Sequence, residues 1–355
     1  MRIKPKILTV FLSKRFLSGL GLVLLIISGI IFAITFVEKL PREGTALAAA
    51  NVSFFSLLEY IPIFLPIAVF MGTLLTSYNL TKSSESVIIS GAGLSPWQKI
   101  KPFLFTAFFI GMFTTCVVNP YAVKKNSINI DIDNFNLSDN AIWVHESGKD
   151  GSFIMRAKVV KQAKNGNLIF SNVSVLLQDV NLKFLQRVET KELVMSDGEI
   201  SAKSARVFGT DGIPSQMESW SHFSQATPKN FLEKHLKPDQ VSFWRLPKMI
   251  RNMQQIGLPV RAHLTQFWTL LFLPLTLIAM TTLGTAFSQT RERRNFSFGM
   301  KFSMGIMVCF VLYFVMNVFS ALGTSGALPT ILAAGLPPLI ITTFAAMWIV
   351  SFEAI

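Results

Sequence analysis

Histidine and cysteine are the residues from which a metal site or a nucleophilic centre is most often built, and the chain has four histidines and two cysteines. His145 precedes Glu146, but the second histidine of a zinc-protease helix is missing, and the other histidines show no ligand spacing. Cys116 and Cys309 both lie in apolar segments, where small packing residues are usual. We therefore predict neither a metal site nor a disulfide.

Motifs for nucleotide binding and acyl transfer are absent from the sequence. It has no Gly-x4-Gly-Lys-[Ser/Thr] phosphate loop and no Gly-x-Ser-x-Gly nucleophile elbow. Any single Ser-Lys or His-Asp pairing would be a chance occurrence. The expected outcome is a chain without catalytic residues and without a cofactor of its own.

Composition places the chain among integral membrane proteins, with 51% hydrophobic residues, 32 phenylalanines and only 15% charged residues. The net charge of +13 does not call for a nucleic-acid partner, because twelve cations lie in three short stretches, 2–15, 82–101 and 291–301. The short loops between them hold only Lys39 and Arg42. The positive-inside rule then places the three stretches and both termini in the cytoplasm.

Six apolar segments are long enough to cross a bilayer core of roughly 30 Å. They form two groups of three, within regions 1–121 and 262–355: 16–37, 54–79 and 100–118, then 267–287, 302–321 and 328–352. Glu59 is the one acid inside a predicted span. It lies about one turn from the outer boundary, so we interpret it as interfacial, and the spans lack the charges of an ion-coupled transporter.

The polar insert, 122–261, is predicted to be β-rich and to lie outside the cytosol. Apolar residues alternate along 151–160, and turn signals stand at Asn165-Gly166, Asp197-Gly198 and Asp211-Gly212. Its 19 Lys and Arg against 14 Asp and Glu suit an anionic ligand or a solvated basic surface equally well. A connector helix is predicted over about 243–256, capped by Ser242, against the domain or the membrane surface.

Two charged segments flank the spans. Residues 81–97, between the second and third spans, are predicted to form a short amphipathic cytoplasmic helix that ends at glycine and proline and suits docking to a cytosolic partner. After the first span, Lys39 and Arg42 stand beside Pro41, with Glu38 and Glu43 around them. This cluster is either an interfacial anchor or a contact for an anionic headgroup, to which Arg offers a bidentate fork.

In total, three spans, a β-rich insert and three more spans resemble the LptF and LptG permease subunits of the lipopolysaccharide-export ABC transporter. The resemblance covers nearly the whole chain. It is carried by Ser84-Glu-Ser-Val-Ile-Ile-Ser-Gly-Ala-Gly-Leu-Ser95, by Phe36-Val-Glu-Lys-Leu-Pro-Arg-Glu-Gly44 and by Ile142-Trp-Val-His-Glu. The Phe36–Gly44 stretch and the 332–338 run favour the G-type subunit over the F-type.

The resemblance implies a fold, a pathway and partners. The fold would be an α-helical integral membrane protein with six transmembrane helices (3+3) and a β-jellyroll-like periplasmic domain between helices 3 and 4. Lipopolysaccharide would be taken from the bacterial inner membrane by a heterodimer with the paralogous permease LptF. A cytoplasmic LptB dimer would hold ATP and Mg²⁺, and the periplasmic bridge LptA and the membrane-anchored LptC would complete the system.

The resemblance also implies roles for particular residues. The segment around Glu85 corresponds to a coupling helix that enters a groove on the ATPase, with Ser84, Val87, Ile88, Gly91 and Gly93. Lys39 and Arg42 correspond roughly to residues that meet the lipid headgroup, although Pro41 stands where the family often has another lysine. Phe153 and Ile169 would line a lipid conduit inside the insert.

Two other functions remain open at this point. A membrane-anchored scaffold or sensor would bind protein partners through its β domain and move no lipid, but would not need the Glu85 segment. The chain would alternatively be the F-type paralogue. An ion-driven flippase would need charges within the spans, and these are lacking.

Overall fold

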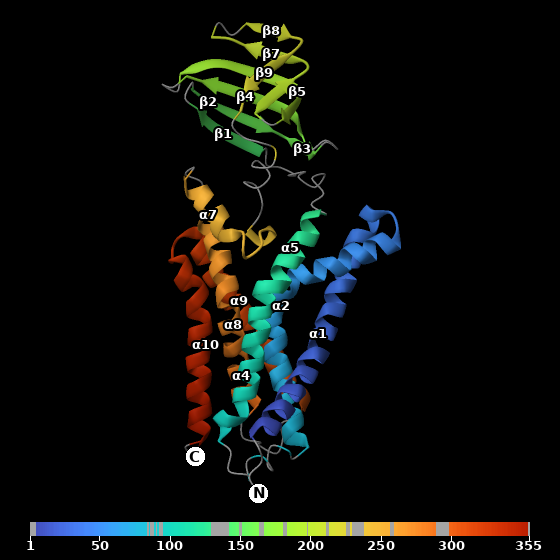
Figure 1. Cartoon of the computed structure of the whole chain (residues 1–355), viewed down its shortest axis with the longest axis vertical. Coiled ribbons are helices and arrows are strands. Elements are labelled where there is room, and N and C mark those ends of the chain that lie inside the picture. Colours follow the sequence, from blue (N-terminus) through green and yellow to red (C-terminus); the bar gives the residue numbers. More distant parts are fainter. Residues whose placement is uncertain are drawn as a thin grey trace. The chain divides into compact units, whose positions relative to one another are not determined.

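The computed structural model describes residues 5–83, 85, 89, 91, 95–128, 142–148, 151–162, 167–179, 183–196, 198–210, 213–224, 228, 238–255, 259–288 and 298–353. The chain divides into two compact units, Met1–Ser127 with Pro238–Ile355, and Ile128–Lys237. The first is helical and the second is built of strands (Figure 1). Compared with the expected insert, 122–261, the β unit is shorter at both ends, because the segments flanking it pack with the helices.

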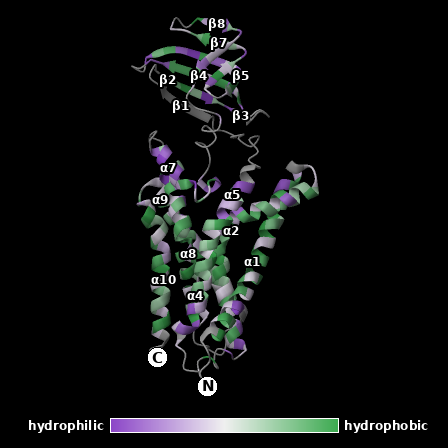
Figure 2. Cartoon of the chain, in the orientation of Figure 1, coloured by the Kyte–Doolittle hydropathy of each residue, from purple (hydrophilic) through white to green (hydrophobic). Residues whose placement is uncertain are grey.

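Six helices of the described residues are long and apolar enough to cross a membrane, as predicted. Figure 2 shows hydrophobic residues along most of their length. In chain order the helical unit comprises α1 (Pro5–Glu43), α2 (Ala46–Lys82), α4 (Pro96–Phe113), the π-helix η1 (Thr114–Val118), α5 (Asn119–Ile128), η3 (Pro238–Gln240), α7 (Leu246–Gln255), α8 (Arg261–Ser288), α9 (Phe298–Ser325) and α10 (Thr330–Glu353). Helix α1 begins and α10 ends at the same end of this unit (Figure 1).

Helix α8 forms the centre of the helical unit and packs against α2, α4, α9 and α10. In its most apolar stretch 67% of the residues are buried, against 17% for α1 and 11% for α9. The buried hydroxyls of α8 are satisfied within the helix: Thr276, Thr281 and Thr282 each donate to the carbonyl four residues earlier. Because these hydroxyls are hydrogen-bonded within the helix, burying them in an apolar setting costs little free energy. Helices α1 and α9, in contrast, present apolar surface outward.

Several glycines lie where two helices pack closely together. A Cβ atom on Gly72 of α2 would lie 2.8 Å from the Cα of Leu20 on α1, and one on Gly111 of α4 would lie 2.6 Å from the Cα of Pro274 on α8. Both obstacles are backbone atoms, so they have little room to move. The absence of a side chain at these positions is what allows the helix pairs to pack.

The helix ends differ from the predicted ones for local reasons. Helices α1 and α2 extend past the apolar runs 16–37 and 54–79, because a helix continues through polar residues that hydropathy does not detect. Ser95 and Pro96 start α4: the Ser95 hydroxyl accepts from the Gln98 N–H, and the Gln98 side chain accepts from the Ser95 N–H. Proline is favoured in a first helical turn, so this pair marks a beginning as well as an end.

The second unit is an antiparallel sheet, and the prediction of a β-rich insert between the third and fourth spans is confirmed. Nine strands pair in its described residues, with β1-β2-β4-β5-β6-β9 as the main path, β3 beside β4, and β7 between β5 and β8. The strands are β1 (Ile142–Gly148), β2 (Gly151–Ala157), β3 (Val159–Gln162), β4 (Leu168–Gln178), β5 (Phe184–Ser196), β6 (Glu199–Ala202), β7 (Ala205–Phe208), β8 (Pro214–Met217) and β9 (Trp220–Phe223). Gly198, at a φ of 86°, makes the expected turn between β5 and β6. Asn165-Gly166 and Asp211-Gly212 lie outside the described residues.

Strands β4 and β5 bend together at Asn172, the one non-glycine residue with positive φ (52°) among those described. On β4 the buried positions are even-numbered before this residue and odd-numbered after it, and β5 changes parity at the facing position. Both halves of each strand thereby direct apolar side chains to one interior. That interior consists of sixteen buried residues: Phe153, Met155, Ala157, Leu168, Phe170, Val173, Val175, Leu177, Val188, Leu193, Met195, Ile200, Ala202, Ala205, Val207 and Trp220.

Candidate functional site

Glu85, the acid expected in the coupling segment, lies three residues beyond the end of α2 and contacts α1. Its Oε1 accepts a hydrogen bond from Nη2 of Arg15 at 2.7 Å, and the two charged side chains form an ion pair. Arg15 lies one turn from the closely packed crossing of α1 and α2. The pair therefore connects the segment after α2 to the start of the first span.

The other residues assigned to the coupling segment are only partly described. Gly91 is exposed, and no other segment of the described chain comes within 4 Å of the place where its Cβ would be. Ile89 is 7% exposed and joins the apolar core of the helical unit. Ser84, Val87, Ile88 and Gly93 lie outside the described residues. Among its described residues, Ile89 joins the segment to the helical unit through an apolar contact and Glu85 through an ion pair.

Lys39, expected to meet a lipid headgroup, lies on α1 and donates from Nζ to the hydroxyl of Ser56 on α2. Ser56 in turn donates to the Val52 carbonyl at 2.9 Å. The side chain of Lys39 is half-buried, so its ammonium is held against α2. The side chain of Arg42 lies outside the described residues, and the chain passes from α1 to α2 through Gly44, at a φ of 68°, and the N-cap Thr45.

The two residues expected to line a conduit occupy different positions in the sheet. Phe153 on β2 is 4% exposed, belongs to the buried interior and meets the His222 ring edge-on at 5.7 Å. Ile169 on β4 alternates with Leu168 and Phe170, is half-buried and is not part of that interior. The alternation of side chains along a strand explains the difference, since adjacent residues point to opposite faces.

The sequence reasoning missed a junction where the segments that leave and re-enter the helical unit are fastened together. We define it by Thr115, Cys116 and Asn119 on one side and Phe243 and Trp244 on the other. The Phe243 N–H donates to Oδ1 of Asn119 at 2.9 Å, and the Trp244 indole Nε1 donates to the Cys116 carbonyl at 3.1 Å. The Phe243 ring also stacks on Phe267 of α8 at 5.5 Å. Helix α7 begins at Leu246, later than the predicted 243.

Two prolines explain the hydrogen bonds at the junction. Pro120 has no N–H to offer the Cys116 carbonyl four residues earlier, and this carbonyl accepts from Trp244. Pro274 likewise cannot serve the Leu270 carbonyl, which accepts from the Thr115 hydroxyl at 2.8 Å. Both carbonyls lack the helical N–H donor that proline cannot supply, and each accepts a hydrogen bond from a side chain of another segment. Apolar surroundings require such a replacement. The π-helix at 114–118 brings Thr115 and Cys116 to these positions.

Replacing Asn119 with alanine should destabilise the helical unit by about 1–3 kcal/mol, because the buried N–H of Phe243 loses its acceptor. The measurement is thermal unfolding of the purified chain in detergent. Asn317→Ala is the matched control, because the Asn317 amide is exposed and donates only to the Tyr313 carbonyl of its own helix. Equal melting temperatures for the two variants would contradict the role assigned to Asn119.

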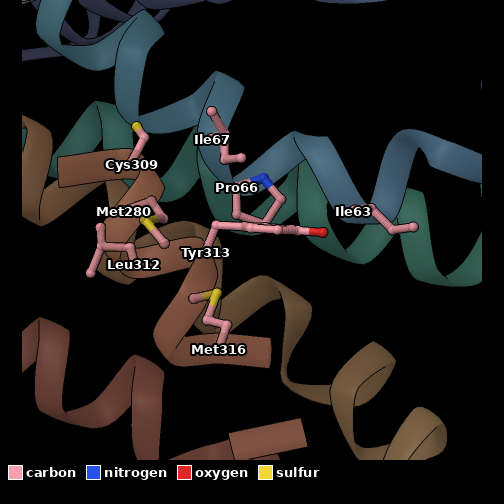
Figure 3. Close-up of a pocket in the computed structure, with 8 residues that line it drawn as sticks. All are labelled: Ile63, Pro66, Ile67, Met280, Cys309, Leu312, Tyr313 and Met316. Atoms are coloured by element: carbon pink, nitrogen blue, oxygen red, sulfur yellow. The ribbon is translucent and has the colours of Figure 1, made fainter. Parts of the chain in front are cut away.

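An apolar pocket opens between α2, α8 and α9 and comprises, with the space open to its surroundings, about 260 Å³ (Figure 3). Its lining is Ile63, Pro66, Ile67, Met280, Cys309, Leu312, Tyr313 and Met316. In Figure 3, Tyr313 extends across the pocket between Pro66 and Met316. Such a lining accepts apolar groups.

Comparison with known proteins gives this arrangement its family. The family model described as lipopolysaccharide export system permease LptF/LptG matches residues 10–351, which include both compact units. The chain belongs to the LptF/LptG family. It is 22% identical to the lipopolysaccharide export system permease protein LptG of Escherichia coli K12 over 341 residues, 92% of this chain and 93% of the relative. LptG of Haemophilus influenzae is also 22% identical, over 343 residues, 93% of this chain and 94% of the relative.

The LptF/LptG assignment confirms the resemblance from the sequence and the class of function. The chain is a permease of lipopolysaccharide export, with six candidate membrane spans and an antiparallel sheet between the third and the fourth. Membership of this family implies that the permease works with other subunits of the export system. Within the described residues, no group of three His, Cys, Asp or Glu side chains is arranged to hold a metal ion.

Proposed function

We propose that the chain is the G-type permease subunit, which extracts lipopolysaccharide from the bacterial inner membrane and passes it through the β unit toward the outer membrane. Both termini are cytoplasmic and the β unit is periplasmic. The subunit has no catalytic role of its own: ATP and Mg²⁺ are bound by a cytoplasmic LptB dimer. LptF is its partner in the membrane, and LptC and LptA receive the lipid.

The observation that carries this proposal is the continuity of the family match, which runs from residue 10 to 351 through the helical unit and the β unit alike. A membrane anchor with an unrelated binding domain would match in only one of them. The G-type assignment follows the name LptG of the matched relatives and the stretches 36–44 and 332–338 of this sequence.

The physical properties of the helical unit suit the extraction of a lipid. Moving acyl chains from a bilayer into water costs about 0.8 kcal/mol per methylene, so the chains need apolar shelter throughout. The outward apolar surfaces of α1 and α9 and the pocket at Tyr313 supply such shelter on the membrane side. We assign the pocket to part of one acyl chain, because its lining is apolar.

The β unit offers the second apolar environment. Its sixteen-residue interior extends along both halves of β4 and β5, because the bend at Asn172 keeps the buried positions on one side. Acyl chains that enter this interior would exchange one apolar surrounding for another. The route then needs energy mainly for the polar headgroup and for opening the sheet.

A photo-crosslinking amino acid at Phe153 should give ATP-dependent adducts with lipopolysaccharide, at least about fivefold more than the same amino acid at Ile169. The two positions lie on neighbouring strands. Phe153 belongs to the buried interior, whereas Ile169, between the buried Leu168 and Phe170, points to the opposite face. The measurement is the yield of adduct in membrane vesicles that contain the whole transporter, with and without ATP.

Three outcomes would count against the proposal. Adducts found only at lipid-facing positions of α1 and α9 would exclude the β unit as a conduit. If the chain is purified from native membranes and neither an ATPase nor a second six-span permease accompanies it, the scaffold or sensor function would replace the proposed one. A second permease that is itself G-type would reverse the assignment of this chain to the F-type.

A further inference from the structure

Arg15 occupies a position that the coupling segment by itself does not explain. Its guanidinium lies 5.4 Å from the centre of the Phe11 ring and donates to Oε1 of Glu85 at 2.7 Å. The side chain of Glu85 is 25% exposed and that of Arg15 is 51% exposed. The second carboxylate oxygen, Oε2, is buried, and no group among the described residues donates to it.

The backbone that carries Arg15 is held tightly against α2. The Thr76 hydroxyl lies 3.5 Å from the Arg15 carbonyl and donates to the Gly72 carbonyl at 2.7 Å. The next residue, Phe16, is fully buried, and a Cβ on Gly72 would lie 2.8 Å from the Cα of Leu20. Arg15 therefore projects from a part of α1 that packs closely against α2.

The guanidinium of Arg15 holds the Glu85 carboxylate in one orientation through its Oε1. Arginine fixes the plane of the carboxylate better than lysine, because its donors lie in a rigid fork. Oε2 is buried, so the exposed 25% of the Glu85 side chain lies on its other atoms, next to the Arg15 guanidinium. The same pair also keeps Glu85 close to α1 while no partner is bound.

We propose that Arg15 is a positioning residue for coupling: it holds Oε1 of Glu85 and so fixes the coupling segment against α1 when the ATPase docks. The proposal rests on the proposed coupling role of Glu85. The Arg15–Glu85 ion pair also makes the start of the first span part of the coupling contact. A movement of the ATPase groove would then be transmitted to α1 as well as to α2.

The test compares five variants of the whole transporter in proteoliposomes: Arg15→Gln, Arg15→Lys, Glu85→Gln, the Arg15→Gln/Glu85→Gln double variant and Lys14→Gln. Lys14 is the matched control, because it is exposed and carries the same charge in the same turn. Lipopolysaccharide export and ATP hydrolysis are measured per assembled complex, so that losses of folded protein do not count as losses of coupling.

Export per complex should fall about three- to fivefold in Arg15→Gln, as expected for the loss of one partly exposed ion pair. Arg15→Lys should recover part of that loss, since it keeps a cationic donor, and Lys14→Gln should export as the wild type does. The double variant should be no worse than Glu85→Gln, because Arg15 acts only through Glu85.

Three results would overturn the inference. If Glu85→Gln reduces export and Arg15→Gln does not, Arg15 has no positioning role while the proposed function stands. If the losses of the two single variants multiply in the double variant, Arg15 acts by another route. If Glu85→Gln itself exports at the wild-type rate, the coupling role of Glu85 fails and the inference fails with it.

Discussion

Export of lipopolysaccharide by the assembled transporter should fall at least about tenfold when Glu85 is replaced by lysine. The new ammonium would lie beside the Arg15 guanidinium, where Oε1 now accepts at 2.7 Å, and the two cations would repel each other in the coupling segment. Like charges placed together at an interface cost several kcal/mol, and about 1.4 kcal/mol already changes an equilibrium tenfold. The measurement pairs export with ATP hydrolysis in proteoliposomes.

The control for charge reversal is Glu189→Lys in the β unit. Glu189 pairs with Arg187, and the exposures of these side chains, 37% and 52%, resemble those of Glu85 and Arg15. This variant should export normally, since it breaks a comparable ion pair away from the ATPase. Wild-type export by Glu85→Lys in a fully assembled complex would show that the coupling role is wrong.

Replacing Gly111 with valine should lower the stability of the helical unit by about 3 kcal/mol or more, since overpacking a core by a smaller group already costs about 1–3 kcal/mol. The first added carbon would lie 2.6 Å from the Cα and 3.0 Å from the N of Pro274, and 3.2 Å from a methyl group of Leu277. Two of these three atoms belong to the backbone, so α4 and α8 would have to separate. The loss should appear as a lower melting temperature in detergent and as less folded protein in the membrane.

Gly21 provides the matched position for this prediction. It lies within α1, and no atom stands within 4 Å of its would-be Cβ, so Gly21→Val should leave the melting temperature nearly unchanged. Gly111→Ala should fall between the two. A Gly111→Val chain as stable as the wild type would mean that α4 and α8 pack less closely than the structure shows.

The membrane part of the fold was predictable because each span is a long apolar run, and the β unit because its turns are marked by pairs such as Asp197-Gly198. The bend at Asn172 was not predictable, because the sequence of β4 does not reveal which of its faces is covered on either side of that residue. The starts of α1 and α2 were missed for a different reason: hydropathy reports what lies in lipid, while a helix continues wherever its backbone hydrogen bonds do.

The candidate site was predictable one residue at a time but not as a set of contacts. Glu85 stood out as an acid in a short apolar segment, yet its partner Arg15 is 70 residues away, and local patterns say nothing of that distance. At the junction the sequence contained half of the signal. Pro120 and Pro274 indicate that the carbonyls four residues earlier lack their usual N–H donor. Which side chains supply the replacement is decided by tertiary packing alone.

The junction also has a consequence for how the chain is made. The side chain of Asn119 accepts its hydrogen bond from the backbone N–H of Phe243, which is synthesised 124 residues later. At roughly 5–20 residues per second, synthesis of that stretch takes about 6–25 s. During this interval the third span is already made, but the Cys116 carbonyl and the face at Gly111 have yet to meet their partners. The first three spans are therefore an incomplete intermediate whose assembly ends only when the fourth span enters the membrane.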